Sequence, residues 1–121
     1  MSMMDEKPIN GMLVPYRALD LTDEKGIFCG KVLGDLGCDV IKIEKPGGDR
    51  ARRIGPFYHD ICHPEKSLYW FAFNTNKRGI TLDIETADGR EISGNSFGAP
   101  ILSLNLLPQA IWTSSGWVIQ T

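Results

Sequence analysis

The sequence predicts an α/β fold built on a parallel sheet, and three observations within residues 16–49 support that prediction. Residues 17–21 are a short, mainly apolar run that ends in polar and turn-forming residues. Residues 27–36 then carry apolar side chains at helical spacing, and residues 40–43 are a run rich in β-branched side chains. A strand, a helix and a second strand in this order are typical of the first βαβ unit of a parallel sheet.

The predicted helix has a clear period and a clear end. Its apolar positions recur at helical spacing, and they are Ile27, Phe28, Val32, Leu33 and Leu36. Gly37 follows at the position of a left-handed C-terminal cap. The second strand ends at Pro46, which has no N–H to donate to a ladder, and Gly47 and Gly48 allow a tight loop after it.

The segment after this unit is less regular. Residues 50–66 are rich in Arg, His, Pro and Asp and show no sustained period, which predicts a long loop of a kind that often carries function. Residues 67–73 are apolar and aromatic and suit either a short helix or a strand, because periodicity alone does not choose between them. Ser67 is a good helix N-cap and favours the helix.

Two further elements are predicted before the composition changes. Residues 80–84 alternate apolar and polar side chains, which predicts a half-buried strand with Leu82 and Ile84 in the core. Thr86 is a suitable N-cap for a helix that begins at residues 87–92. The helical pattern is lost at Ser93, so we expect this helix not to continue.

The last part of the chain differs from the rest in composition. Residues 93–121 contain five serines, scattered glycine and proline, no clean period and no charged side chain. The predicted organisation is therefore an N-terminal arm at residues 1–15, an α/β body at residues 16–92 and an atypical tail at residues 93–121.

Composition argues against several functional classes. The chain has 121 residues, 42% of them apolar and 23% charged, which fits at most one soluble globular domain. A net charge of -2 argues against broad binding of nucleic acid. No apolar run approaches the roughly 20 residues of a membrane helix. Residues 1–10 lack the apolar core of a signal peptide, so no membrane association and a cytoplasmic location are expected.

The cysteines and histidines predict no metal site. Cys29, Cys38 and Cys62 are widely spaced without a CxxC pair, which indicates reduced thiols. His59, Asp60, Cys62 and His63 lie close in sequence, but tetrahedral zinc needs four ligands on a folded scaffold and no second ligand pair follows. The dinucleotide, P-loop and GxSxG nucleophile motifs are also missing from the sequence.

Four segments in a fixed order resemble the start of a class III CoA-transferase: LDLTDEKG, CGKVLGDLGCDVIKIEKPGGD, RRIGPF and FNTNKRGITLDIETADGRE. This family, also called the CaiB/BaiF type, includes the formyl-CoA transferases, the carnitine CoA-transferases and the bile-acid-inducible CoA-transferases. The resemblance covers about residues 16–92. It implies the N-terminal part of a Rossmann-like parallel-sheet domain, incomplete here, from a family whose subunits form interlocked homodimers.

The resemblance also implies an activity. Class III enzymes transfer CoA from an acyl-CoA to a carboxylic acid, so CoA and acyl-CoA are expected as substrates and no prosthetic group is expected. Their nucleophile is an aspartate that forms a mixed anhydride and then an aspartyl-CoA thioester. That aspartate lies well beyond the matched segments in the family, and no aspartate here matches its motif. We therefore name no catalytic residue and expect this chain to be inactive alone. The alternatives are a non-enzymatic CoA- or nucleotide-binding module and a fragment without a stable fold.

By similarity, seven residues are expected to contact CoA: Lys25, Gly26, Lys45, Leu82, Asp83, Ile84 and Glu85. Lys45 takes the place of a basic residue that meets a CoA phosphate, although a solvated lysine beside a turn is the plainer reading. Lys25 and Gly26 precede the first helix, where backbone N–H groups favour anions, but their loop is one residue shorter than in formyl-CoA transferases. Residues 82–85 match a segment that lies against the nucleotide.

An arginine cluster follows the glycine loop. Arg50, Arg52 and Arg53 could neutralise phosphates through bidentate contacts, or could simply form a solvated cationic face.

The tail suggests a change of reading frame. If the frame moves by one nucleotide, the codons of Trp112-Thr113 and Trp117-Val118 must contain codons for aspartate and glycine. Synonymous choices then turn residues 104–118 into ESFAPGYLDELGLGY, which resembles what class III enzymes carry next. The hypothesis is an out-of-frame tail at residues 93–121. Resequencing the gene through these codons and beyond tests it, and an intact frame without a downstream continuation would refute it.

Overall fold

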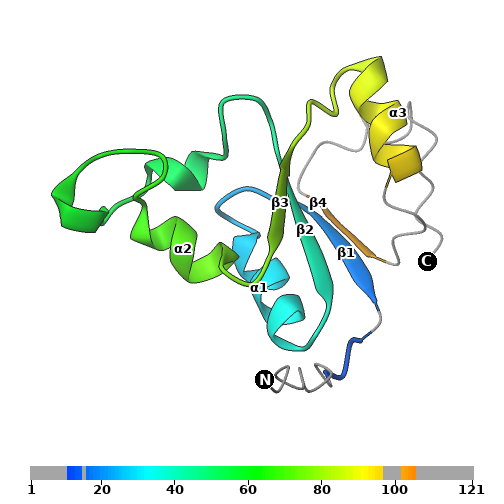
Figure 1. Cartoon of the computed structure of the whole chain (residues 1–121), viewed down its shortest axis with the longest axis horizontal. Helices are drawn as coiled ribbons and strands as arrows, with labels where there is room; N and C mark the ends of the chain where they lie inside the picture. The colour runs from blue at the N-terminus through cyan, green and yellow to red at the C-terminus, as the bar shows by residue number, and fades with distance from the viewer. Residues whose placement is uncertain (1–10, 15, 97–101, 106–121) are drawn as a thin grey trace, which may run out of the picture.

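A computed structural model of the chain describes residues 11–14, 16–96 and 102–105. Four parallel strands form one sheet in the order β3-β2-β1-β4 (Figure 1). The strands are β1 (Arg17–Leu21), β2 (Asp39–Glu44), β3 (Arg78–Thr81) and β4 (Leu102–Asn105). The helices between them are α1 (Ile27–Asp35), α2 (Leu68–Asn74) and α3 (Ala87–Ser96). The predicted α/β fold with a parallel sheet is confirmed.

The order in which strands are added to the sheet reverses at β1. The chain runs from β1 through β2 to β3 across one half of the sheet and then returns to put β4 on the other side of β1. Right-handed crossovers then place the first two helices on one face and the third on the opposite face. Figure 1 shows this arrangement, with α1 and α2 together and α3 across the sheet. Open sheets of this kind bind ligands beyond the carboxyl ends of their strands.

Helix α1 ends as the sequence predicts. Gly37 has a φ of 99°, which is the left-handed conformation that glycine adopts without strain. The Cys38 N–H donates to the Leu33 carbonyl at 3.0 Å, and the Gly37 N–H donates to the Gly34 carbonyl at 3.0 Å. These bonds satisfy carbonyls at the helix end and turn the chain directly into β2.

The two faces of the sheet carry separate apolar clusters because successive side chains of a strand alternate. Ala18 and Val40 are buried on one face, with Leu33 of α1 packed against them. Leu19, Ile41 and Ile43 are buried on the other. A third cluster of Ile27, Ala51 and Trp70 joins α1 and α2 to the first turn after β2. Burial on both faces is typical of a parallel sheet.

The predicted helix at residues 67–73 is confirmed, and so is its cap. The Ser67 hydroxyl accepts from the Trp70 N–H at 3.1 Å at the start of α2. The prediction of one continuous loop at residues 50–66 was incomplete. Two short 3₁₀ helices lie there, η1 (Arg50–Arg53) and η2 (Tyr58–Asp60), because the Asp49 side chain accepts from the Ala51 N–H and starts the first of them.

The predicted strand at residues 80–84 was placed too late in the sequence. Strand β3 ends at Thr81, and Leu82 and Ile84 follow it. The Leu82 N–H still donates to the Glu44 carbonyl at 2.8 Å, but Asp83 then accepts from the Glu85 and Thr86 N–H groups and bends the chain. Leu82 and Ile84 nevertheless pack against the core cluster of Leu19, Ile41 and Ile43. The alternation of apolar and polar residues at 80–84 therefore indicates which side chains are buried, although residues 82–84 are not part of a strand.

The expected loss of the helix after residue 92 was also wrong. Thr86 accepts from the Gly89 N–H at 3.0 Å as a cap, and α3 then continues to Ser96. Strand β4 follows and pairs with β1, with Ala18 opposite Leu102. The helix therefore continues through residues of weak helix propensity, of which Ser93 is buried. Most of the predicted tail, residues 97–101 and 106–121, lies outside the described residues, as do residues 1–10 and 15 of the predicted arm.

Within the part of the chain that is described, no helix is long and apolar enough to cross a membrane.

Candidate functional site

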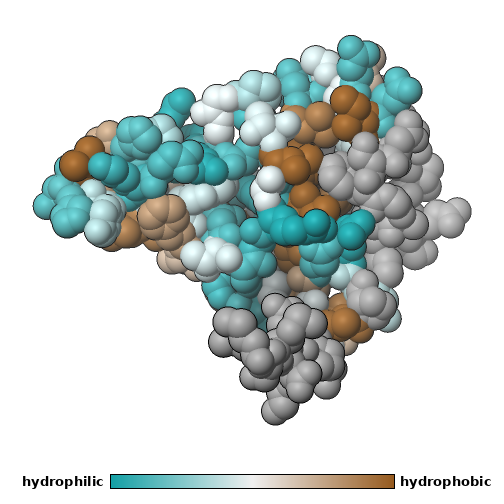
Figure 2. Space-filling view, viewed as in Figure 1, coloured by the Kyte–Doolittle hydropathy of each residue, from teal (hydrophilic) through white to brown (hydrophobic). Residues whose placement is uncertain are grey.

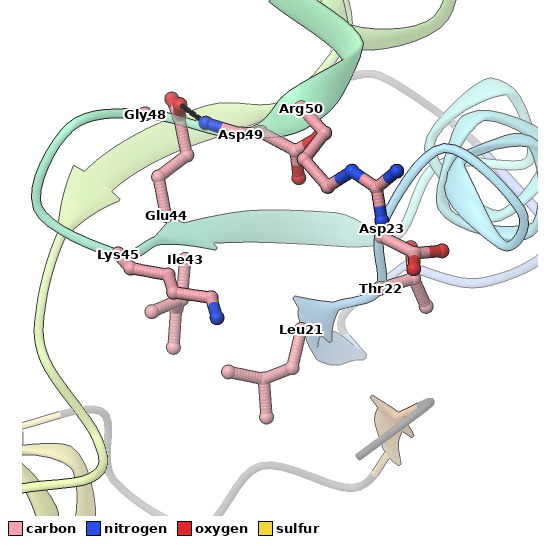
Figure 3. A pocket seen from close by; sticks show the side chains of 9 residues that line it. All are labelled: Leu21, Thr22, Asp23, Ile43, Glu44, Lys45, Gly48, Asp49 and Arg50. Atoms are coloured by element: carbon pink, nitrogen blue, oxygen red, sulfur yellow. Dashed lines mark hydrogen bonds between the residues drawn. The ribbon is translucent and has the colours of Figure 1, made fainter.

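A pocket of about 210 Å³ lies at the carboxyl ends of β1 and β2 (Figure 3). Its walls come from the turn after β1 and from the glycine loop after β2. The lining residues are Leu21, Thr22, Asp23, Ile43, Glu44, Lys45, Gly48, Asp49 and Arg50. This is the edge of an open α/β sheet at which ligands bind.

A smaller hollow of about 50 Å³ adjoins the pocket. It shares Leu21, Ile43 and Lys45 with the pocket and adds residues 82–85 after β3. The structure thus brings together five of the seven residues predicted to contact CoA: Lys45, Leu82, Asp83, Ile84 and Glu85. They gather because the carboxyl ends of neighbouring parallel strands meet at one edge of the sheet.

Lys45 supplies an available cation at the junction of the two hollows. Its side chain is exposed, and its ammonium makes no ion pair with any described residue. Figure 3 shows the Lys45 chain crossing Ile43 with its ammonium directed toward Leu21. On the same face of the sheet, Leu21, Ile80, Leu82 and Ile84 are only partly buried. Figure 2 shows hydrophobic residues at the surface between the sheet and α3. A cation beside an apolar wall suits a ligand with both a phosphate and a flat or aliphatic group.

Lys25 and Gly26 lie beside this site but line neither hollow. Gly26 is the N-cap residue of α1, and Lys25 is exposed. The Lys25 N–H donates to the Asp23 carboxylate at 2.9 Å, which links this loop to a residue of the pocket wall. The two residues are therefore neighbours of the pocket through Asp23.

Arg50, Arg52 and Arg53 lie in three different environments. Arg52 holds Glu44 in a bidentate pair, with Nε to Oε2 and Nη2 to Oε1 both at 2.7 Å, and its guanidinium lies 4.0 Å from the centre of the Trp70 ring. The guanidinium of Arg52 is therefore used in contacts within the protein and is not available to bind a ligand phosphate. Arg50 lines the pocket with a side chain that is 76% exposed, and its closest acidic partner is Glu24 at 3.6 Å. Arg53 is exposed and lines neither hollow.

Glu44 stays ionised in the pocket wall. Burial alone would raise the pKa of its carboxyl, but the Arg52 guanidinium and the Asp49 N–H, which donates to Oε2 at 2.8 Å, hold the pKa below its ordinary value. This carboxylate fixes the shape of the glycine loop and is not available as a free base.

Charged residues that the sequence analysis did not select lie buried beneath the pocket. Asp20 and Lys42 face each other in the register of β1 and β2, and Lys77 reaches them from the turn before β3. Burial alone would raise the pKa of Asp20, but Lys42, Lys77 and the Thr22 hydroxyl together keep the pKa below its ordinary value. Burial lowers the pKa of Lys77, and Asp20 opposes that effect. A sequence signal existed, because a charged residue inside an apolar strand is rarely buried without a partner.

The histidine-rich loop holds its potential metal ligands at the surface. His59, Cys62 and His63 are exposed, and His63 Nδ1 accepts from the Glu65 N–H at 3.1 Å. Within the described ranges, no group of three potential ligands lies close enough to hold a metal ion.

Comparisons with known proteins identify relatives of this chain. The model of CoA-transferase family III matches residues 17–95. The chain is 39% identical over 77 residues to the succinyl-CoA:(R)-benzylsuccinate CoA-transferase subunit BbsE of Thauera aromatica, which covers 64% of this chain and 19% of that protein. It is also 39% identical over 107 residues to the formyl-CoA:oxalate CoA-transferase of Escherichia coli O139:H28, which covers 86% of this chain and 24% of that protein.

Solved structures agree with these matches. A crystal structure of the protein Rv3272 from Mycobacterium tuberculosis superposes with a TM-score of 0.72 at 28% identity, covering 88% of this chain and 28% of that one. A CAIB/BAIF family protein from Brucella suis superposes with a TM-score of 0.60 at 39% identity, covering 69% of this chain and 22% of that one. The chain spans about a fifth to a quarter of the length of these curated relatives, which are named CoA-transferases. With the family model matching more than half of it, the chain belongs to CoA-transferase family III, the class III CoA-transferases.

Proposed function

We propose that the pocket at the carboxyl ends of β1 and β2 binds CoA or acyl-CoA. The chain then contributes part of the CoA site of an acyl-CoA:carboxylate CoA-transferase. The observation that carries this proposal is the convergence of Lys45 and residues 82–85 on two adjoining hollows, with the Lys45 ammonium free of any ion pair to a described residue. These are five of the seven residues that family resemblance predicts to contact CoA.

The proposed roles follow from the chemistry of the ligand. CoA carries a pyrophosphate, a ribose phosphate, an adenine and an apolar thiol arm. The Lys45 ammonium neutralises a phosphate, and Leu21, Ile43 and Leu82 form the apolar wall. Arg50, exposed at the other wall of the pocket, supplies a second cation within reach of the ligand. Lys25 and Gly26 extend the site at the start of α1.

We propose that this chain alone does not carry out the covalent step. In acyl transfer to a carboxylate nucleophile, the carboxylate oxygen attacks the acyl carbon, the C–S bond breaks and CoA leaves as the thiolate. The carboxylates of Glu44 and Asp49 at the pocket are held by Arg52 and Lys42. The other carboxylates that line the two hollows, Asp23, Asp83 and Glu85, match no nucleophile motif of the family. The nucleophile comes from outside the described residues. Assembly into the interlocked homodimer of the family and a cytoplasmic location belong to the same proposal.

Binding of CoA to the purified 121-residue chain tests the proposal directly. Isothermal titration calorimetry at low salt should show saturable binding of CoA and much weaker binding of pantetheine, which lacks the phosphates and the adenine. Lys45→Gln should weaken CoA binding by about tenfold, since a charge-assisted contact to phosphate is lost. Lys66→Gln is the matched control, because Lys66 lines neither hollow, and its affinity should stay within about twofold of the original chain.

The binding and exchange experiments test the site and the missing nucleophile separately. Absence of saturable CoA binding by the original chain, or unchanged affinity in Lys45→Gln, would refute the proposed site. An exchange assay with succinyl-CoA and a labelled carboxylate should show no transfer by this chain alone, and turnover would refute the proposal that the nucleophile lies elsewhere.

A further inference from the structure

One buried ammonium group holds both walls of the pocket. The Lys42 side chain is 1% exposed and lies on the face of β2 that is turned toward α1. Its Nζ donates to the Thr22 carbonyl and lies 3.4 Å from Asp20 Oδ1 and 3.4 Å from Asp49 Oδ2. The contacts to Thr22 and Asp20 are hydrogen bonds, and the contact to Asp49 is an ion pair.

The three oxygens come from different parts of the site. Asp20 lies within β1, whereas Thr22 belongs to the turn after β1 and Asp49 to the loop after β2. Thr22 and Asp49 line the pocket on its two sides, and the Lys42 ammonium lies beneath them (Figure 3 shows the two lining residues). One buried side chain therefore contacts both walls, and the Thr22 wall is also held by hydrogen bonds from its N–H and hydroxyl to Asp20 Oδ1 at 3.0 and 2.6 Å.

Asp49 links the Lys42 ammonium to the backbone of the glycine loop. Its Oδ1 accepts from the Ala51 N–H at 2.8 Å, and its own N–H donates to Glu44 Oε2 at 2.8 Å. The Asp49 side chain is only 8% exposed. If Asp49 loses Lys42, its largely buried carboxylate loses its one ion pair among the described residues, and we expect it to turn toward water and move the loop that carries Lys45 and Arg50.

Lys77 is a second buried lysine that pairs with Asp20, so it can be compared with Lys42. Its side chain is also 1% exposed, and its Nζ donates to Asp20 Oδ2 at 2.8 Å and to the Ile27 carbonyl at 2.9 Å. Lys77 thus neutralises the same aspartate from the other side, but it contacts the start of α1 and lines neither hollow. Loss of either lysine leaves one uncompensated buried negative charge, and only loss of Lys42 releases the pocket walls.

We propose that Lys42 is a positioning residue for the CoA site, which sets the spacing of the Thr22 turn and the Asp49 loop, whereas Lys77 only stabilises the fold. This inference rests on the proposed function for its ligand. It goes beyond that function because Lys42 itself is buried beneath the pocket and does not meet CoA.

The test compares Lys42→Met with Lys77→Met in the 121-residue chain. Both variants should lower the thermal midpoint by similar amounts, because each unbalances Asp20 in the interior. At a temperature where both are folded by circular dichroism, Lys42→Met should weaken CoA binding about tenfold or more, and Lys77→Met should stay within about threefold. Equal affinity losses in the two variants, or unchanged affinity in Lys42→Met, would overturn the proposal.

Two further measurements keep the proposal testable if binding or folding fails. If Lys42→Met does not fold, Asp49→Asn removes the same wall contact, keeps an oxygen for the Ala51 N–H, and should show the same affinity loss. If the original chain does not bind CoA, the proposed function fails, and hydrogen exchange still decides the positioning role. The Ala51 amide, protected by Asp49, should exchange faster in Lys42→Met and not in Lys77→Met, and equal rates in the two variants would overturn the role.

Discussion

Replacing Arg52 tests the ion pair that holds Glu44 in the pocket wall. Arg52→Ala removes two hydrogen bonds of 2.7 Å to Glu44 and the stacking of the guanidinium on Trp70 at 4.0 Å. The Glu44 side chain is 8% exposed and keeps only the Asp49 N–H as a donor. Breaking a buried pair costs about 3–5 kcal/mol, and Arg52, at 18% exposed, belongs at the lower end of that range. We expect the free energy of unfolding to fall by about 3 kcal/mol.

Urea denaturation measures this change. For a chain of this size the slope of unfolding free energy is about 1–1.5 kcal/mol per molar urea, so the midpoint should fall by about 2–3 M. Arg52→Lys keeps the charge but loses the bidentate geometry, and it should cost about 1 kcal/mol. Arg53→Ala is the control, because Arg53 is exposed, and its effect should stay within about 0.5 kcal/mol. Equal effects for Arg52→Ala and Arg53→Ala would refute the reasoning.

Acid provides a second check on the same pair. The pKa of Glu44 is lowered in the folded chain, so its contribution to stability is present above the unfolded pKa and is lost as pH falls through the folded pKa. The difference in stability between the original chain and Arg52→Ala should therefore shrink below about pH 4. A difference that is unchanged at pH 3 would mean that Arg52 acts through packing on Trp70 and not through Glu44.

The remaining predictions concern stability and can be read in the same urea experiments. Gly30→Ala would place a Cβ 2.3 Å from Asp20 Oδ2 and should cost about 2–3 kcal/mol, whereas Gly79→Ala meets no atom within 4 Å and should be neutral or stabilising. Ser67→Ala removes the cap of α2 and a hydroxyl that donates to the Ile54 carbonyl at 2.6 Å, which should cost about 1–2 kcal/mol, while Ser67→Thr should restore the cap in part. Stability should be nearly flat between about pH 5 and 7 and fall below that range, because the pKa values of Asp20 and Asp39 are also lowered in the folded chain; a rise in stability on acidification would contradict this assignment.

The parts of the fold that the sequence predicts well are those with strong local signals. The period of α1, Gly37 at its end and Ser67 before α2 each depend on neighbouring residues alone, and the structure reproduces them. Residues 93–96 carry no such signal. The strand that follows them pairs with β1, and a local pattern does not contain that long-range pairing.

Some residues of the candidate site could likewise be predicted from the sequence, and others could not. Lys45 and residues 82–85 could be selected because they resemble a family pattern, and the structure brings them to one place. Lys42 and Asp20 are not among the residues that this pattern predicts to contact CoA, and their partners Thr22 and Asp49 lie in different loops. Only the register of β1 against β2 puts these groups together, so their role depends on long-range geometry.

The position of β1 in the middle of the sheet also has a consequence for the order of assembly. One edge of β1 can pair with β2 after a single short helix, but its other edge stays open until residues 102–105 arrive from far along the chain. Contacts between such distant segments form slowly, since a long loop must close first. During that interval β1 presents unpaired N–H and C=O groups on one side, which other extended chains can occupy. We therefore expect association during refolding to increase with protein concentration, through the edge of β1 that β4 covers in the folded chain.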